Sequence, residues 1–187
     1  MKTETYNKII LSATQCFSNG GFNATSINQI AKQANISQGA MYIYFKGKDD
    51  LIIAIVKEEI KSAITLYSQP YTCSAFERIL EISKSCATKN NNAITPSLWM
   101  EIIAESSRNK ILNEHFLLAD SLMREALKKI INQGIEKGEF QNINPEETSI
   151  LLFSILDGLI GRKAVNPSFD FERSLPTFTN TLEKILY

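Results

Sequence analysis

At 187 residues the chain can hold a small domain plus a larger one, or a single two-part helical body. Its hydrophobic fraction of 44% is ordinary for a globular protein. Its formal net charge is zero, yet residues 1–48 carry five lysines and one glutamate, a basic end that suits contact with phosphates. No apolar run approaches the ~18 residues that span a bilayer and no signal-peptide core is present, so we expect a cytoplasmic protein without a membrane partner.

The first predicted helix covers residues 5–18. Ile9, Ala13 and Phe17 lie on one face at helical spacing, and Asn19-Gly20-Gly21 provides the stop. We expect this helix to brace the two shorter helices that follow it.

Residues 26–34 predict the first short helix. Ser26 and Gln29, three positions apart, form a capping box, and Thr25 is an alternative cap. Asn35 can end the helix because asparagine tolerates the left-handed backbone conformation. Apolar side chains recur on one face of this helix, at Ile27, Ile30, Ala31 and Ala34.

A second short helix is expected directly after this turn. Ile36 can fill the turn, and Ser37 is a natural N-cap. Met41 and Phe45, four positions apart, should face inward. Glycine within a short helix costs roughly 1 kcal/mol relative to alanine, so Gly39 indicates that something approaches the backbone there. The side chains left pointing outward are Gln38, Gly39, Ala40, Tyr42 and Tyr44.

These outward-facing residues suit a DNA partner. Tyr42 and Tyr44 flank an apolar position and are suited to phosphate contacts at a groove edge, and Lys46 and Lys48 add cations. Taken one at a time, they are better explained by a helical hairpin with half-buried tyrosines and solvated lysines. Their order and spacing together favour a helix-turn-helix whose second helix lies in a DNA major groove.

The rest of the chain predicts further helices and no strand. Asn144 is a natural cap with Pro145 at the first helical position, and Pro176 must lie in the first turn of the final helix or kink it. We therefore expect an all-α fold of about nine helices. The later helices are expected over residues 49–66, 74–88 with a polar loop at 89–92, from Pro96, 111–137, 144–161, and along a stripe of Leu175, Phe178, Leu182 and Ile185.

Residues 150–161 are apolar almost all round, and a helix of this kind needs partners on several sides. Beside the striped final helix, this pattern implies a subunit interface. The alternative is that the body of the protein buries both helices itself.

The chain up to Leu51 resembles the tetracycline-repressor (TetR) family of bacterial transcriptional regulators. Asn35 stands where these proteins usually carry glycine, and asparagine can adopt the same backbone state. Beyond residue 51 the chain is similar to the family only in length and helical character. The shared positions are Ile9, Ala13, Phe17, Gly20 or Gly21, Phe22, Thr25, Ile30, Ala31, Ala34, Ser37, Gly39, Tyr42, Tyr44, Phe45, Lys48 and Leu51.

The resemblance implies a three-helix DNA-binding domain at residues 1–48 and a larger helical ligand-binding and dimerisation domain at residues 49–187. It implies a homodimer built from the last two helices, which presents two heads, roughly 34–36 Å apart, to a palindromic operator in double-stranded DNA. The expected function is repression that a small-molecule effector relieves. We assign the DNA contacts to Thr25, Ser26, Ser37, Gln38, Gly39, Ala40, Tyr42, Tyr44, Lys46 and Lys48.

The resemblance also implies a small-molecule cavity in the larger domain. Asp157, if it is buried, needs a partner or a cationic ligand, and a capping or interface hydrogen bond is the alternative. For Trp99 and Phe116 the alternative is ordinary core packing. The candidates mix aromatic, sulfur and ionisable groups: Tyr67, Trp99, Glu101, Phe116, Met123, Phe153 and Asp157.

Neither catalysis nor a cofactor or metal site is expected. With one histidine, no paired cysteines and no glycine-rich phosphate loop, the chain lacks the converging groups of an enzyme. The scattered cysteines fit a reducing compartment, and Cys16 is expected to be a small core residue. A redox role for Cys73 or Cys86 remains open.

Overall fold

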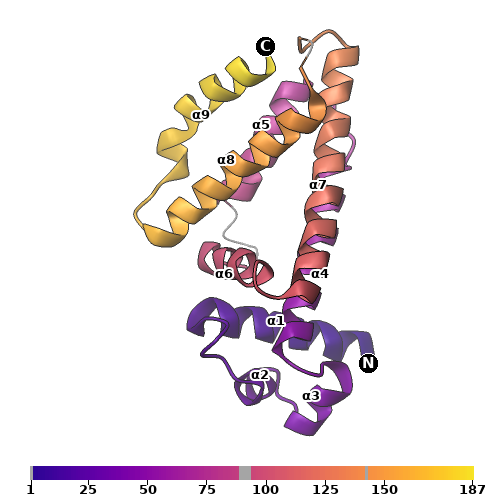
Figure 1. Ribbon diagram of the computed structural model, residues 1–187, viewed down its shortest axis with the longest axis vertical. Helices are drawn as coiled ribbons and strands as arrows, with labels where there is room; N and C mark the ends of the chain where they lie inside the picture. Colours follow the sequence, from indigo (N-terminus) through magenta and orange to yellow (C-terminus); the bar gives the residue numbers. More distant parts are fainter. Residues whose placement is uncertain (1, 89–93, 142) are drawn as a thin grey trace. The chain divides into compact units, whose positions relative to one another are not determined.

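The computed structural model describes residues 2–88, 94–141 and 143–187, and these form helices without a strand (Figure 1). The all-α fold predicted from the sequence is confirmed, and each predicted helix has a counterpart. The expected polar loop at residues 89–92 lies outside the described residues. The helices are α1 (Lys2–Gly20), α2 (Ile27–Gln33), α3 (Gln38–Tyr44), α4 (Lys48–Tyr67), α5 (Ala75–Thr88), α6 (Pro96–Ser106), α7 (Lys110–Glu136), α8 (Pro145–Val165) and α9 (Phe171–Leu186).

The chain forms two compact units. The first contains Met1–Glu59 and Asn90–Leu118, and the second contains Ile60–Lys89 and Ala119–Tyr187. Helices α4 and α7 therefore each contribute residues to both units. The domain boundary expected at residue 48 stays a prediction.

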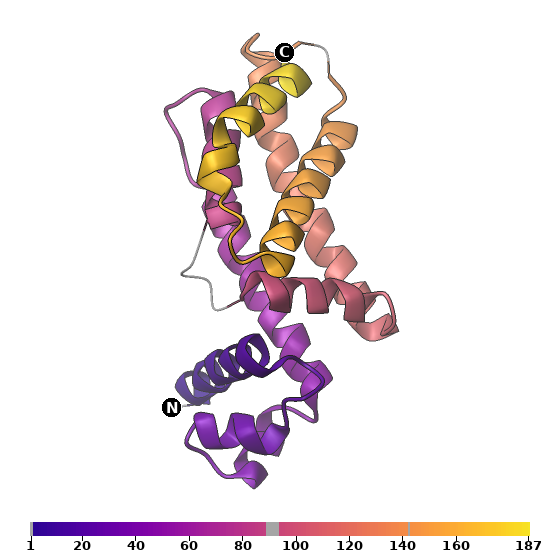
Figure 2. The same ribbon diagram turned by 90° about the vertical axis from the view of Figure 1, so that its left-hand side faces the viewer.

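The first unit contains an apolar core. Helix α2 packs on α1 and on α3, and α6 packs on α1. Both views place α2 and α3 on the opposite side of α1 from α6 (Figures 1 and 2). Burying a large apolar side chain stabilises a fold by about 1.5–3 kcal/mol, so this core gives α3 a firm base. The largest fully buried side chains are Ile9, Phe17, Ile30, Met41, Leu51, Ile52, Leu98, Ile102 and Leu112.

The turn between α2 and α3 follows the predicted local signals. Ser26 caps α2 and forms a reciprocal capping box with Gln29. Asn35 takes a positive φ of 52°, and the Ser37 hydroxyl accepts a hydrogen bond from the Ala40 N–H at 3.1 Å. These bonds satisfy amides that would otherwise be left without a partner at the helix starts.

The second unit has an apolar core of its own, in which α5 packs on α8 and α9. Gly134 in α7 is required by this packing, because a Cβ atom there would lie 2.3 Å from the ring of Phe140. The core residues are Tyr67, Ala75, Ile79, Ile82, Leu127, Ile130, Ile131, Phe140, Leu152, Phe171, Phe178, Leu182 and Leu186.

Helix α9 begins at Phe171, with Asp170 as its N-cap, so Pro176 lies inside the helix beyond its first turn. Proline lacks the N–H that would close the preceding helical turn. The predicted apolar stripe faces the core, where Phe178 and Leu182 are buried.

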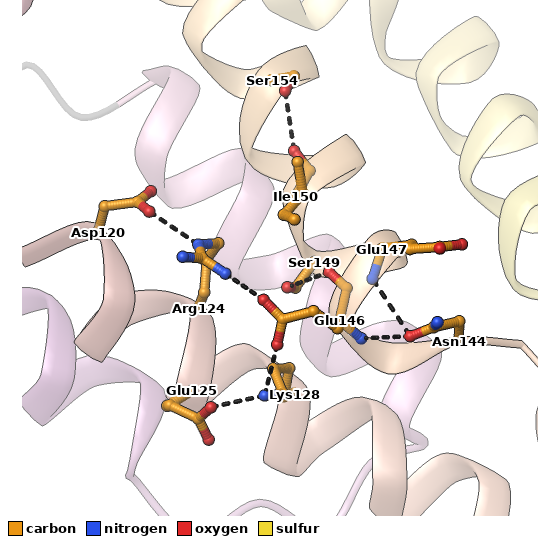
Figure 3. A network of polar contacts seen from close by, with 10 residues as sticks. All are labelled: Asp120, Arg124, Glu125, Lys128, Asn144, Glu146, Glu147, Ser149, Ile150 and Ser154. Carbon is orange, nitrogen blue, oxygen red and sulfur yellow. Dashed lines mark hydrogen bonds and ion pairs between the residues drawn. The ribbon is translucent and has the colours of Figure 1, made fainter. Parts of the chain in front are cut away.

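A polar network joins α7 to the start of α8 (Figure 3). Arg124 donates from Nε to Asp120 Oδ2 at 2.7 Å and from Nη1 to Glu146, and Lys128 Nζ lies 2.6 Å from Glu146 Oε2. The hydrogen bonds from Lys128 and Arg124 lower the pKa of Glu146. Asn144 caps α8 beside this network, as expected.

Candidate nucleic-acid interface

Helix α3 is anchored by two apolar side chains that face the core of the first unit. Met41 is fully buried and Phe45, which follows the helix, is 4% exposed. The ring of Phe45 stacks on Tyr6 of α1, with the ring centroids 5.3 Å apart. Both inward-facing positions predicted from the sequence are therefore confirmed, and they fix which face of α3 points outward.

The outward face of α3 mixes polar, aromatic and aliphatic groups. Gln38 and Gly39 are exposed in its first turn, and Tyr42 and Ile43 are 51% and 80% exposed in its second. Residues 38 and 42 are four positions apart and share one side of the helix, and residues 39 and 43 share a neighbouring side in the same way. Ala40 and Tyr44 are half-buried.

Nothing in the described chain requires glycine at position 39. A Cβ atom built there would meet only the Ser37 hydroxyl, at 4.0 Å, and the backbone is not in the left-handed region. Within the described chain, neither packing nor backbone conformation therefore explains a glycine at this position.

Several predicted DNA contacts make bonds within the first unit. Thr25 is 5% exposed, and its hydroxyl donates to the Gly21 carbonyl at 2.8 Å. Lys48 Nζ donates to the Phe22 carbonyl at 2.7 Å and to the Asn23 carbonyl at 3.1 Å. The Ser26 and Ser37 hydroxyls cap helices, and Lys46 is exposed.

Glu101 reaches the connection between α1 and α2. Its Oε2 accepts a hydrogen bond from the backbone N–H of Phe22 at 2.6 Å. A Cβ atom on Gly21, whose φ is +79°, would lie 3.1 Å from the Glu101 Oε1. Residue 22 is thus held from both sides, by a carboxylate of α6 at its N–H and by the Lys48 ammonium at its carbonyl. Sequence reasoning placed Glu101 among ligand candidates and missed this bond, which joins residues 79 positions apart.

The other ligand candidates are divided between the two units. In the first unit, the half-buried Trp99 and Phe116 pack together with ring centroids 5.9 Å apart. In the second, Tyr67 is buried, with its hydroxyl 3.5 Å from Cys86 Sγ. Met123 and Phe153 pack against the second core, and Asp157 is half-buried.

A groove between α1 and α2 was not predicted. Cys16 is half-buried and lines it, so this residue is not the core residue that we expected. Burial raises the pKa of the Cys16 thiol, which keeps it protonated. The groove is lined by Gln15, Cys16, Asn19, Gly20, Ala24, Thr25, Gln29 and Gln33.

None of the described helices is long and apolar enough to cross a membrane. Among the residues with described positions, no group of three or more His, Cys, Asp or Glu side chains is arranged to hold a metal ion.

A capped two-helix turn whose second helix is anchored by its inner face and exposed on its outer face defines a helix-turn-helix DNA-binding protein. Residues 9–55 match the family described as bacterial regulatory proteins, tetR family, and residues 80–187 match the BetI-type transcriptional repressor C-terminal family. The chain belongs to the TetR family, and its function is that of a DNA-binding transcriptional regulator.

Individual relatives agree with this assignment. A probable HTH-type transcriptional regulator, YttP of Bacillus subtilis, is 32% identical over 147 residues, which cover 75% of this chain and 68% of that protein. The structure of Salmonella enterica GusR matches with a TM-score of 0.83 and 26% identity, covering 98% of this chain and 95% of that one. The fold is also shared with the transcriptional regulator FadR of Bacillus subtilis in complex with stearoyl-CoA, with a TM-score of 0.77, 21% identity and coverage of 97% and 100%.

Proposed function

We propose that this protein is a dimeric repressor that binds a palindromic operator, with α3 of each protomer in a major groove, and that a small molecule releases it from DNA. The observation that carries the proposal is the outer face of α3, where Gln38, Gly39 and Tyr42 are exposed above a helix anchored by Met41 and Phe45.

The chemistry of each exposed group suggests its role on DNA. Gln38, near the N-terminus of α3, has an amide that can pair with an adenine edge. Gly39 lets the helix backbone approach the bases, and Tyr42, Tyr44 and Lys46 are suited to phosphates. The backbone and hydroxyl groups of Ser26 and Ser37, beside the half-buried Ala40, complete the surface.

Thr25 and Lys48 have a different part in the proposal. The Thr25 hydroxyl is committed to backbone carbonyls, so Thr25 would act by positioning the start of α2. Lys48 uses two of its three donors on the carbonyls of Phe22 and Asn23. The third N–H would be directed at a phosphate.

We propose that residues 1–48 form the DNA-binding domain and that residues 49–187 bind the effector and dimerise through the last two helices. Helix α8 supports this interface, because Ile150 and Leu151 are 47% and 46% exposed and Gly158 on the same side is open. Two-fold symmetry would then place two α3 helices on two half-sites of one operator.

The effector would act by shifting the population of the dimer away from the arrangement that fits the operator. A coupling of roughly 1–3 kcal/mol is enough to change operator occupancy several-fold. Two features support a route to the DNA-binding end: the bond from Glu101 of α6 to Phe22, and the start of α4 at Lys48. Its site of action would be the cytoplasm, where operator DNA lies.

The test is binding of the purified protein to duplexes selected from a random library, followed by fluorescence anisotropy. The affinity for the selected duplex should fall steeply with added salt. Tyr42→Ala should weaken binding to all duplexes alike, whereas Gln38→Ala should change which bases are preferred. If no duplex is enriched, or if neither variant changes binding, the proposal fails.

The effector is tested separately, starting with stearoyl-CoA because the FadR of Bacillus subtilis was solved in complex with it. A molecule that binds the protein should weaken the operator complex. If such a molecule binds and the operator affinity stays the same, release by that molecule is contradicted.

A further inference from the structure

Ile43 is the most exposed side chain of α3 whose character does not suit a phosphate. It is 80% exposed, while Met41 and Phe45 on either side are buried. Single exposed apolar residues are common on protein surfaces, so exposure alone decides nothing. What matters is where on α3 this residue lies.

Ile43 lies four positions after Gly39 and directly after Tyr42, so it stands one turn further along the same side of the helix as the glycine. Gly39 is the position at which nothing in the described chain prevents a Cβ atom. A partner that comes close enough to the helix to require glycine at position 39 would also cover the isoleucine at position 43.

The chemistry of the groove then selects the partner atom. An aliphatic side chain cannot hydrogen-bond to a phosphate or to a base edge. In the major groove the apolar group that a base pair presents is the C5-methyl of thymine, and cytosine carries only hydrogen at the same position. An aliphatic side chain placed in the major groove would therefore favour thymine over cytosine.

We propose that Ile43 reads a thymine in each operator half-site through its C5-methyl group, as a specificity determinant beside Gln38. The inference rests on the proposed function, in which α3 enters the major groove. It adds a base identity that the polar residues of α3 do not supply.

The experiment uses the full-length protein and a duplex selected from a random library. Each thymine of one half-site is replaced in turn by deoxyuridine, which lacks only the methyl group, and Kd is measured by fluorescence anisotropy. At one thymine the wild-type protein should bind about 3- to 5-fold more weakly, the effect of one buried methyl group.

Ile43→Ala should bind the unmodified duplex more weakly by a similar factor, and it should be insensitive to deoxyuridine at that position. Gln38→Ala is the control at another exposed position of α3, and it should keep the full sensitivity to the missing methyl. Because the Ile43 side chain is exposed, unchanged thermal unfolding of Ile43→Ala would show that the variant is folded.

The outcomes separate the inference from the proposed function. If no thymine methyl affects the wild-type protein, or if Ile43→Ala keeps the sensitivity, the inference is overturned while operator binding itself stands. If the wild-type protein enriches no duplex, the proposed function fails first.

Discussion

A methyl group added at Gly39 would meet only the Ser37 hydroxyl, 4.0 Å away. Gly39→Ala should therefore stabilise the protein by roughly 0.5–1 kcal/mol, since alanine loses less backbone freedom in a helix. It should also weaken operator binding roughly tenfold, ~1.4 kcal/mol, by holding α3 away from the bases. Thermal unfolding and anisotropy measured on the same samples check both signs. A rise in Tm with unchanged operator affinity would show that nothing approaches the backbone at this glycine.

A second prediction at the residue scale concerns the hydrogen bond from the Phe22 N–H to the Glu101 carboxylate. Glu101→Ala leaves the Phe22 N–H without its charged acceptor, which should destabilise the protein by about 1–2 kcal/mol. Hydrogen exchange of the Phe22 amide should become faster, and operator affinity should fall because the start of α2 is less well held. Glu101→Gln, which keeps an acceptor oxygen, should be intermediate.

Glu105→Ala is the matched control for Glu101, because Glu105 lies on the same helix and pairs with the exposed Arg108 at 3.0 Å. It should leave Phe22 exchange unchanged. Equal protection of the Phe22 amide in wild type and in Glu101→Ala would contradict the role of this bond.

At the scale of elements, the network between α7 and α8 predicts a pH dependence. The hydrogen bond from Lys128, followed by that from Arg124, lowers the pKa of Glu146. A lowered carboxyl pKa means that ionised Glu146 favours the folded state at neutral pH, and that this contribution is lost as the pH falls through the lowered pKa.

Glu146→Gln should therefore be less stable than wild type at neutral pH and equally stable in acid. The difference should be small, because Glu146 is exposed to solvent screening. Urea midpoints of both proteins across the acidic range check it, and a difference that persists below the carboxyl range would assign the effect to packing instead.

The two short helices could be predicted almost to the residue because their signals are local. The capping box of Ser26 and Gln29, the left-handed Asn35 and the inward pair Met41 and Phe45 each depend on residues within one or two turns. The short range of these signals also made the resemblance to a known family specific.

Longer-range features could not be predicted in this way. Glu101 bonds to the backbone N–H of Phe22, which lies 79 positions earlier in the chain. Because every residue except proline has such an N–H, the sequence does not indicate which one a distant carboxylate will bind. Likewise, the sequence shows Gly134 only as a glycine inside a predicted helix. The need for glycine there becomes clear only from the position of the Phe140 ring, which leaves no room for a Cβ atom. The half-burial of Cys16 depends on how α1 and α2 leave a groove between them.

For the whole molecule, the exposed apolar side of α8 predicts a dimer that one charge can weaken. Leu151→Glu would place a carboxylate in the proposed interface and should weaken association at least tenfold, on the order of 1.4 kcal/mol or more. Sedimentation over a range of concentrations measures this change. Operator binding should then require a higher protein concentration, because the two DNA-binding domains are no longer joined in one dimer.

Ile111→Glu provides the same chemical change at an exposed isoleucine of α7 in the first unit, where the side chain is 64% exposed. This variant should remain dimeric. Dissociation of both variants, or of neither, would rule out α8 as the specific contact between subunits.

Glu101 accepts its hydrogen bond from the backbone N–H of residue 22, so this bond does not depend on the side chain at that position. Replacing the phenyl ring of Phe22 would remove its packing on Phe17 and its contact with the Lys48 ammonium. The hydrogen bond to Glu101 of α6 would persist with every residue at position 22 except one. Proline, which has no N–H, is that exception. A library randomised at position 22 would thus separate loss of the aromatic contact from loss of the hydrogen bond to Glu101 within a single experiment.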